Sequence, residues 1–276
     1  LPLETGFHNL AIVASRQRYP RQARKTAFGL LGAGQMMFLK SIVATDANHP
    51  VKDLDALLDA LDSKVDIAHD IQILDGQVAD TLAHAAPWDN VHSKVVIDAS
   101  TPTFDDPESA SDIPSGPGDG FAEIASMVDG VSAVRMLRPS MLVVTTHIKG
   151  GPRADASMES LDEEAAAAQR AHIARLRDEI WSLDGSENLR WLFITDDDAD
   201  LSADDWRRRL LWQLFCRFEV SRDLHFDEVR TRIAWDATAP IPSIEGPLPV
   251  RRWPAVTLHD TAVEAKVDAW LEENNL

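Results

Sequence analysis

The chain alternates short, almost wholly apolar runs with longer segments in which apolar residues recur at helical spacing. The runs at 9–14 and 41–45 have the length and continuity of strands buried on both faces of a parallel sheet. Residues 51–62 place leucines at i, i+3, i+4 and i+7, which is the pattern of an amphipathic helix. Strand character returns at 71–74 and 95–97. This alternation predicts an α/β fold with a mainly parallel sheet covered by helices.

A further helix is predicted between the first two strands, from Pro20 to about Phe38, because proline is well tolerated in a first helical turn. This segment contains Gly29, Gly32 and Gly34. Each glycine costs about 1 kcal/mol relative to alanine in a helix interior. The three glycines therefore favour close packing of this helix against the sheet or against a ligand.

The same order of segments then occurs a second time. The sequence K-S-I-V-A-T-D at 40–46 corresponds to R-W-L-F-I-T-D at 190–196, and S-K-V-V-I-D-A-S-T-P at 93–102 corresponds to T-R-I-A-W-D-A-T-A-P at 231–240. Between these blocks, each copy has an amphipathic helix pattern and then an acidic segment, D-I-A-H-D in one and E-V-S-R-D in the other. Chance similarity between apolar strands is the alternative. Four blocks in one order favour two related strand-helix-strand units.

A linker is expected between the two units. Residues 103–120 are rich in Pro, Gly, Ser and Asp and poor in residues that could be buried, which is typical of a flexible connector. We therefore expect a first α/β unit at 1–102, this linker, and a second α/β unit at 121–276 that ends in a C-terminal helix.

The second unit has its own strand and helix signals. Strands are expected at 141–147 and 191–195, and helices at 157–183 and 203–215. In the final helix, Thr261 and Glu264 match a capping box. An apolar stripe on that helix consists of Val263, Val267, Trp270 and Leu271. Such a helix either docks on its own sheet or reaches a second subunit.

Composition narrows the range of partners. The chain has 45 acidic and 27 basic residues, for a formal net charge of −18, so its average surface repels nucleic acid. The single cysteine, Cys216, cannot form an intramolecular disulfide, which favours a reducing, cytoplasmic location. No apolar run approaches the roughly 18 to 20 residues that span a bilayer. The start lacks an initiator Met and a signal-peptide pattern, so we expect the chain to be a piece of a longer protein.

The sequence shows few signs of the common catalytic or metal-binding motifs. The acidic run that includes Asp196, Asp198 and Asp200 contains oxygen ligands suited to a hard cation, but a solvated helix start stabilised by negative charge is the simpler interpretation. The nine histidines lack zinc-site spacing, and there is no G-x-S-x-G elbow. The glycines of G-L-L-G-A-G lie late in a helix pattern, so a dinucleotide site is not indicated. We predict no metal ligands and no catalytic residues within the chain.

Lys40 is the one candidate binding residue. It stands directly before a predicted buried strand and after the end of a predicted helix, where a single cation could meet a phosphate. Arg190 holds the equivalent place in the second unit. The alternative is that the Lys40 stem lies along the helix with its ammonium in water.

Taken together, these blocks resemble a known family. The segments N-L-A-I-V-A-S-R-Q-R-Y-P-R-Q-A-R-K-T-A, M-F-L-K-S-I-V-A-T-D, D-L-D-A-L-L-D-A-L, V-D-I-A-H-D and S-K-V-V-I-D-A-S are similar to the C-terminal domain of UbiD-type, prenylated-FMN-dependent carboxy-lyases. The second unit resembles the same stretch again, through D-D-W-R-R-R-L-L-W, S-R-D and I-A-W-D-A-T. The linker and the duplication resemble the longer, menaquinone-type members.

The resemblance implies an activity and a partner. UbiD-type enzymes decarboxylate aromatic or α,β-unsaturated acids, as in ubiquinone and menaquinone biosynthesis, with prenylated FMN, a divalent metal such as Mn and a monovalent cation. The resemblance places their acid-base residues and metal ligands in a flavin-binding domain that precedes the region matched here, so this chain alone should be inactive and hold no cofactor. It implies that Lys40 approaches the flavin phosphate.

The sequence therefore predicts the C-terminal domain of a UbiD-like decarboxylase that closes over the prenylated-FMN site and mediates assembly. Its expected partners are the flavin-binding catalytic domain of the same enzyme and further copies in a homo-oligomer. A non-catalytic α/β assembly or binding module is the main alternative, and an independent α/β enzyme with an unrecognised site is another.

Overall fold

The computed structural model describes residues 3–102, 113–148, 160–253 and 260–274. The first unit contains a four-stranded sheet in the order β1-β2-β4-β3. Strands β1, β2 and β4 are parallel, and β3 runs antiparallel at the edge. The bounds of its elements are β1 Leu10–Ser15, α1 Gln22–Leu31, β2 Ser41–Asp46, α2 Leu54–Lys64, α3 Ile67–Asp70, β3 Ile71–Val78 and β4 Val91–Asp98, with single-turn 3₁₀ helices at Leu3–Thr5 and Gly34–Phe38.

The second unit has a five-stranded sheet in the order β5-β6-β7-β9-β8. Strands β6, β7 and β9 are parallel, whereas β5 and β8 are antiparallel edge strands. Its elements are α4 Phe121–Ala125, β5 Val131–Arg138, β6 Met141–Thr146, α5 Glu163–Trp181, β7 Trp191–Asp196, α6 Trp206–Cys216, α7 Val220–Asp223, β8 Leu224–Phe226, β9 Ile233–Asp236 and α8 Thr261–Glu273, with short 3₁₀ helices at Ser186–Asn188 and Asp197–Ala199.

The two sheets share one topology. When β6, β7, β9 and β8 are matched to β1, β2, β4 and β3, the strand order and the strand directions agree, and β5 is an addition. Helices α2 and α6 follow equivalent strands, as do the short helices α3 and α7. The predicted α/β fold with two related strand-helix-strand units is therefore confirmed.

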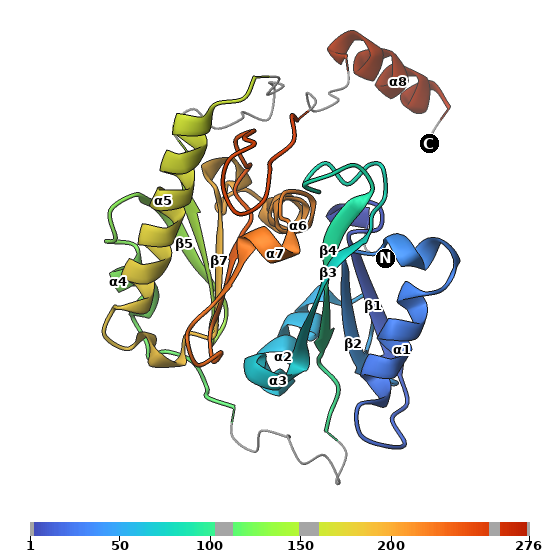
Figure 1. Ribbon diagram of the computed structural model, residues 1–276. Coiled ribbons are helices and arrows are strands. Elements are labelled where there is room, and N and C mark those ends of the chain that lie inside the picture. The colour runs from blue at the N-terminus through green and yellow to red at the C-terminus, as the bar shows by residue number, and fades with distance from the viewer. Residues whose placement is uncertain (1–2, 103–112, 149–159, 254–259, 275–276) are drawn as a thin grey trace.

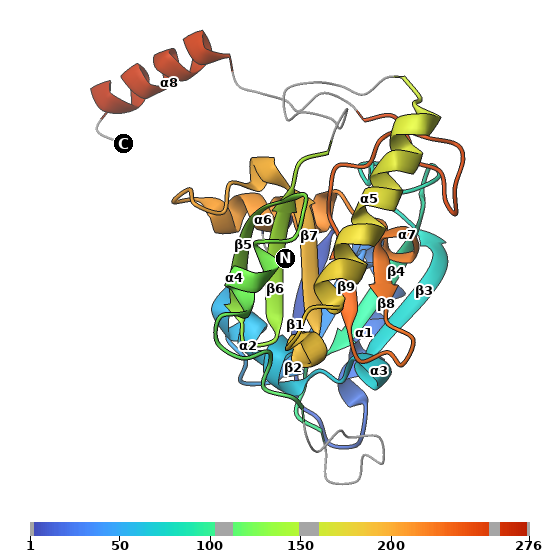
Figure 2. The same ribbon diagram turned by 90° about the vertical axis from the view of Figure 1, so that its left-hand side faces the viewer.

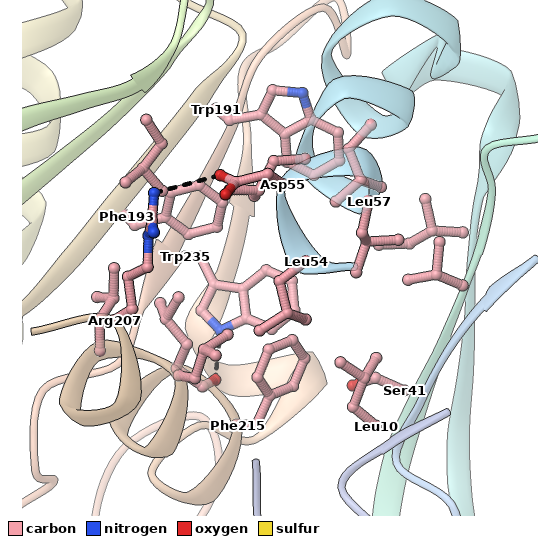
Figure 3. Close-up of a pocket in the computed structure, with 18 of the residues that line it drawn as sticks. Leu10, Ser41, Leu54, Asp55, Leu57, Trp191, Phe193, Arg207, Phe215 and Trp235 are labelled. Atoms are coloured by element: carbon pink, nitrogen blue, oxygen red, sulfur yellow. Dashed lines mark hydrogen bonds and ion pairs between the residues drawn. The ribbon is translucent and has the colours of Figure 1, made fainter. Parts of the chain in front are cut away.

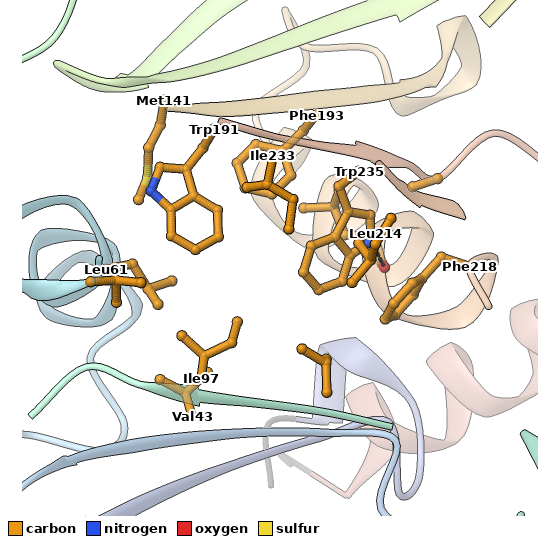
Figure 4. Close-up of a cluster of buried hydrophobic side chains, with 14 of the residues drawn as sticks. Val43, Leu61, Ile97, Met141, Trp191, Phe193, Leu214, Phe218, Ile233 and Trp235 are labelled. Atoms are coloured by element: carbon orange, nitrogen blue, oxygen red, sulfur yellow. Dashed lines mark hydrogen bonds between the residues drawn. The ribbon is translucent and has the colours of Figure 1, made fainter. Parts of the chain in front are cut away.

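The helices and sheets form layers (Figures 1 and 2). Helix α1 covers the outer face of the first sheet, and α4 and α5 cover the outer face of the second. The largest apolar cluster lies between the two sheets and combines their inner faces with α2 and α6. Figure 4 shows Trp191, Phe193 and Trp235 of the second sheet opposite Val43 and Ile97 of the first. The two units thus share one core.

Helix α2 shows why these residues form this element. The Asp53 side chain caps its start by accepting hydrogen bonds from the backbone N–H groups of Asp55 and Ala56. Leu57 and Leu61, one turn apart, are buried in the shared core. The helix begins at Leu54, inside the predicted segment 51–62, and ends at Lys64, two residues beyond that segment.

The helix predicted from Pro20 to Phe38 is shorter than expected. Helix α1 ends at Leu31, and Gly34 adopts φ +50, a left-handed conformation that an α-helix interior cannot contain. A Cβ atom added at Gly29 would meet nothing within 4 Å. Close packing of these glycines against the sheet is therefore wrong, because Gly32 caps the end of α1, Gly34 lies beyond it and Gly29 faces open space. Close packing against a ligand stays a prediction.

The structure describes only part of the predicted linker at 103–120. Residues 103–112 lie outside the described residues, whereas the following segment packs closely at one point. Gly116 has φ +97, and a Cβ atom there would lie 2.0 Å from the carbonyl oxygen of Pro139. The division into units at 103–120 stays a prediction.

The C-terminal helix α8 stands apart from both sheets (Figure 1). None of its described side chains is buried, and Val263 and Trp270 are each about half exposed. Docking on its own sheet is therefore not observed. Its start is capped by Asp260, whose side chain accepts from the N–H groups of Ala262 and Val263, so the predicted cap at Thr261 is wrong by one residue. Asp is preferred over Thr as an N-cap.

Candidate functional site

Lys40 lies directly before β2, as predicted, but its ammonium is buried between the units. The residue is 2% exposed. Its Nζ donates a hydrogen bond to the carbonyl oxygen of Phe218, at 3.0 Å, and lies 4.5 Å from the centre of the Phe218 ring. Burial lowers the pKa of Lys40 from 10.5 to about 8, against the opposing influence of nearby Cys216 and Glu219. The alternative in which the ammonium reaches water does not describe this lysine.

Arg190 makes the reciprocal contact from the second unit. It precedes β7, and its Nη1 donates to the carbonyl oxygen of Val65, at 2.7 Å, while Nη2 donates to the carbonyl oxygen of Asp62. Val65 and Phe218 hold equivalent places, since each comes directly before the N-cap residue of α3 or α7. The cation before β2 therefore binds a carbonyl group just after α6 of the other unit, and the cation before β7 binds carbonyl groups at the end of α2.

This reciprocity has an electrostatic reason. The last carbonyl groups of an α-helix have no partner within the helix and carry partial negative charge. Arg190 satisfies two such groups, those of Asp62 and Val65 at the end of α2. The Phe218 carbonyl that Lys40 binds lies just beyond the C-cap of α6, near the negative end of that helix. Because both contacts join residues more than 120 positions apart, they fix how the two units pack.

Two further charged groups, Glu219 and Lys94, are buried in this region. Glu219 is fully buried, and its Oε1 accepts from the N–H of Ser93 at 2.7 Å, whereas Oε2 has no hydrogen-bond partner among the described residues. Burial raises the pKa of Glu219 to about 7. Lys94 donates to three carbonyl oxygens, those of Met37, Leu39 and Val78, at 2.7 to 2.9 Å, and burial lowers its pKa to about 8. Sequence reasoning missed both residues, although Lys94 stands out as a cation inside an apolar strand.

In the first unit, two carboxylates at the ends of β4 and α3 form ion pairs with one arginine. Arg24 of α1 lies between Asp70 and Asp98, at 2.5 and 3.2 Å. The N–H of Ser100 donates to the other oxygen of Asp98. One guanidinium thus joins the end of β4 to the end of α3.

In the second unit the same carboxylates are held differently. Thr238 donates to Asp236 as Ser100 does to Asp98. Asp223 is paired instead with Arg222, its neighbour in sequence, at 2.7 Å. Burial, followed by the charge of Asp223, raises the pKa of Asp236 to about 7. The two copies have therefore diverged in how they compensate a buried acid.

The acidic run after β7 is also engaged by arginine. Arg217 contacts Asp196 at 2.5 Å and Asp198 at 3.0 Å. Desolvation raises the pKa of Asp196 to about 7. Within the described ranges, no group of three or more His, Cys, Asp or Glu side chains is arranged to hold a metal ion. In the same part of the chain, no helix combines the length and apolar character needed to cross a bilayer.

The comparisons with known proteins concern mainly the first unit. Residues 1–99 match the family described as the 3-octaprenyl-4-hydroxybenzoate carboxy-lyase C-terminal domain. An uncharacterised protein of Archaeoglobus fulgidus is 39% identical over 100 residues, which are 36% of this chain and 21% of that protein. An uncharacterised protein of Aquifex aeolicus is 41% identical over 101 residues, which are 37% and 21% of the two chains. The matched region spans about a fifth of the length of these relatives.

Solved structures of decarboxylases show similarity over a comparable share. The vanillic acid decarboxylase of Sedimentibacter hydroxybenzoicus, in an open form, is 26% identical with a TM-score of 0.36, over 42% of this chain and 25% of that one. A UbiD-class enzyme of Pelotomaculum thermopropionicum in complex with FMN is 19% identical with a TM-score of 0.33, over 43% and 26% of the two chains. Because these TM-scores are low, the assignment rests on the sequence match. Residues 1–99 of this chain are therefore similar to the C-terminal domain of the UbiD carboxy-lyase family.

Proposed function

We propose that the chain acts as the C-terminal part of a UbiD-like decarboxylase, which removes carbon dioxide from an aromatic or α,β-unsaturated acid of the kind used in quinone biosynthesis. The match of residues 1–99 to this domain family is the observation that carries the proposal. In this role the chain closes over a flavin site held by a separate catalytic domain and contributes to assembly. The linker and the second unit favour the longer, menaquinone-type members.

The cofactor of the complete enzyme would be prenylated FMN with a divalent metal such as Mn. When bound, the flavin would accept the electrons of the developing carbanion. In the arrangement described here, Lys40 does not fit a phosphate ligand. Its ammonium is covered by the second unit and bound to the Phe218 carbonyl. A contact between Lys40 and the flavin would require the second unit to move away. The contribution expected of the chain is therefore to exclude water and to position the catalytic domain.

The alternative is a non-catalytic assembly module, and one observation favours it. The cations that precede β2 and β7 bind the opposite unit, so both serve packing within the chain. On this account the chain would bind a partner through its acidic surface or through α8, with no influence on cofactor binding.

The effect of the chain on FMN binding separates the two functions experimentally. A flavin-binding domain of a UbiD-type enzyme would be measured alone and mixed with the full chain, and co-elution and the affinity for FMN would be recorded. The proposal expects co-elution, and tighter FMN binding in the mixture than in the flavin domain alone. Because Lys40 is bound to the Phe218 carbonyl, Lys40→Ala should bind FMN as well as the control Lys52→Ala, which removes an exposed lysine.

Two results would count against the proposal. Co-elution without tighter FMN binding in the mixture would support the assembly module. A failure of the wild-type chain to co-elute with the flavin domain would contradict the proposed partner.

A further inference from the structure

The packing of the two units leaves an apolar cavity between them, whose lining extends to the exposed Asp55 and Arg207. Its volume is about 90 Å³, and its walls come from both sheets and from α2 and α6. Figure 3 shows the cavity between Trp191, Phe193 and Trp235 on one side and Leu10 and Ser41 on the other. It is a feature of the contact between the units, so anything that occupies it touches both.

The cavity arises because equivalent positions carry residues of different size. Val43 pairs with Ile97 across neighbouring strands of the first sheet, and the equivalent pair in the second sheet is Phe193 with Trp235. At the start of the same strands, Ser41 corresponds to Trp191. Aliphatic or small residues thus face three aromatic rings, and Figure 4 shows Val43 and Ile97 opposite Trp191, Phe193 and Trp235.

Ser41 is the polar element of this cavity. The residue is 1% exposed, and its Oγ has no hydrogen-bond partner among the described residues. Its hydroxyl group lies on the wall of the cavity (Figure 3). An unpaired buried hydroxyl is costly, by about 1–3 kcal/mol. A group that supplies the missing hydrogen bond would therefore be bound preferentially.

Water does not meet the requirements of this cavity. A buried water typically makes two to four hydrogen bonds, whereas the side chains around Ser41 are almost entirely apolar. Dry apolar cavities bind small apolar molecules, and an engineered cavity of ~150 Å³ accepts benzene. The present volume suits a somewhat smaller molecule, unless the half-buried Leu54 and Leu58 of α2 shift.

We propose that this cavity is a binding site for a small apolar molecule that carries one hydroxyl group, of the size of a short-chain or small cyclic alcohol. The apolar body lies against Phe193 and Trp235, and the hydroxyl group exchanges a hydrogen bond with Ser41. Because such a ligand contacts both units, it stabilises their association. The site is independent of the flavin role proposed above.

The test uses the full chain with cyclopentanol as the probe and cyclopentane as its counterpart without a hydroxyl group. Saturation-transfer NMR gives the dissociation constants, and thermal unfolding reports the stabilisation. Ile97→Phe fills the cavity and should weaken cyclopentanol binding at least ~10-fold. Val43→Leu fills it less and serves if the larger substitution prevents folding.

Ser41→Ala tests the hydroxyl contact. It should weaken cyclopentanol binding by roughly fivefold, as expected for one neutral hydrogen bond, and leave cyclopentane binding unchanged. Ser15→Ala removes another unpaired buried hydroxyl, on β1 and away from the cavity wall, and should change neither. Absence of saturable binding to the wild type, or equal binding by the folded cavity-filling variant, would overturn the site. Equal cyclopentanol binding by Ser41→Ala would overturn the recognition of the hydroxyl group.

Discussion

Replacing Lys40 with methionine should stabilise the protein at neutral pH and destabilise it in alkali. In the folded state the pKa of Lys40 falls from 10.5 to about 8, because the second unit removes water from its ammonium. At 1.36 kcal/mol for each pKa unit, the charged lysine costs about 3 kcal/mol at pH 7. Methionine removes that cost but leaves the buried Phe218 carbonyl unpaired, at about 2 kcal/mol. The variant should therefore be about 1 kcal/mol more stable at pH 7.

The sign of this effect follows from proton linkage. Between pH 8 and 10.5 the unfolded chain holds the Lys40 proton and the folded protein does not, so the wild type gains stability as pH rises through this window. By pH 10 it has recovered about 2 kcal/mol, and the variant should then be about 1 kcal/mol less stable. Urea unfolding followed by tryptophan fluorescence at pH 7 and pH 10 measures both differences. A difference that does not change with pH would refute the burial of Lys40 between the units.

Three further predictions concern neighbouring features. Arg190→Met should lower the free energy of unfolding by about 3 kcal/mol at pH 7, since the carbonyls of Val65 and Asp62 lose their donor; a loss below about 1 kcal/mol would contradict this contact. Asp236→Asn should stabilise the protein above pH 7, by on the order of 2 kcal/mol after solvent screening, and should have almost no effect at pH 4. The reason is that burial raises the pKa of Asp236 to about 7, so the folded state disfavours the charged carboxylate; urea unfolding at both pH values tests this. Gly116→Ala should lower the melting temperature by several degrees, whereas Gly118→Ala, where an added Cβ meets nothing within 4 Å, should not.

The sequence pattern located the strands well because their apolar runs are continuous. The cores of β1, β2, β6 and β7 fall where predicted, and matched blocks indicated that the units share a design. Strand β5 was missed, since Val131–Arg138 mixes apolar and basic residues at an exposed edge. Helix α1 was overextended because a helical periodicity does not reveal that Gly34 turns to positive φ.

The local sequence could not predict which groups the candidate residues contact. The position of Lys40 before a strand was predicted, but its acceptor is 178 residues away in the chain. Only the docking of one unit on the other reveals that Lys40 and Arg190 exchange equivalent roles. The cavity beside Ser41 likewise results from differences in side-chain size between positions that become neighbours only in the folded protein.

The central claim is that this chain completes a UbiD-like decarboxylase without carrying its catalytic groups. The most direct measurement is carbon dioxide release from aromatic and α,β-unsaturated acids, with prenylated FMN and Mn²⁺ supplied, by the chain alone, by a UbiD-type flavin-binding domain alone, and by the two together. We predict no release by the chain alone and faster release by the mixture than by the flavin domain alone. Release by the isolated chain, or no gain in the mixture, would contradict the account.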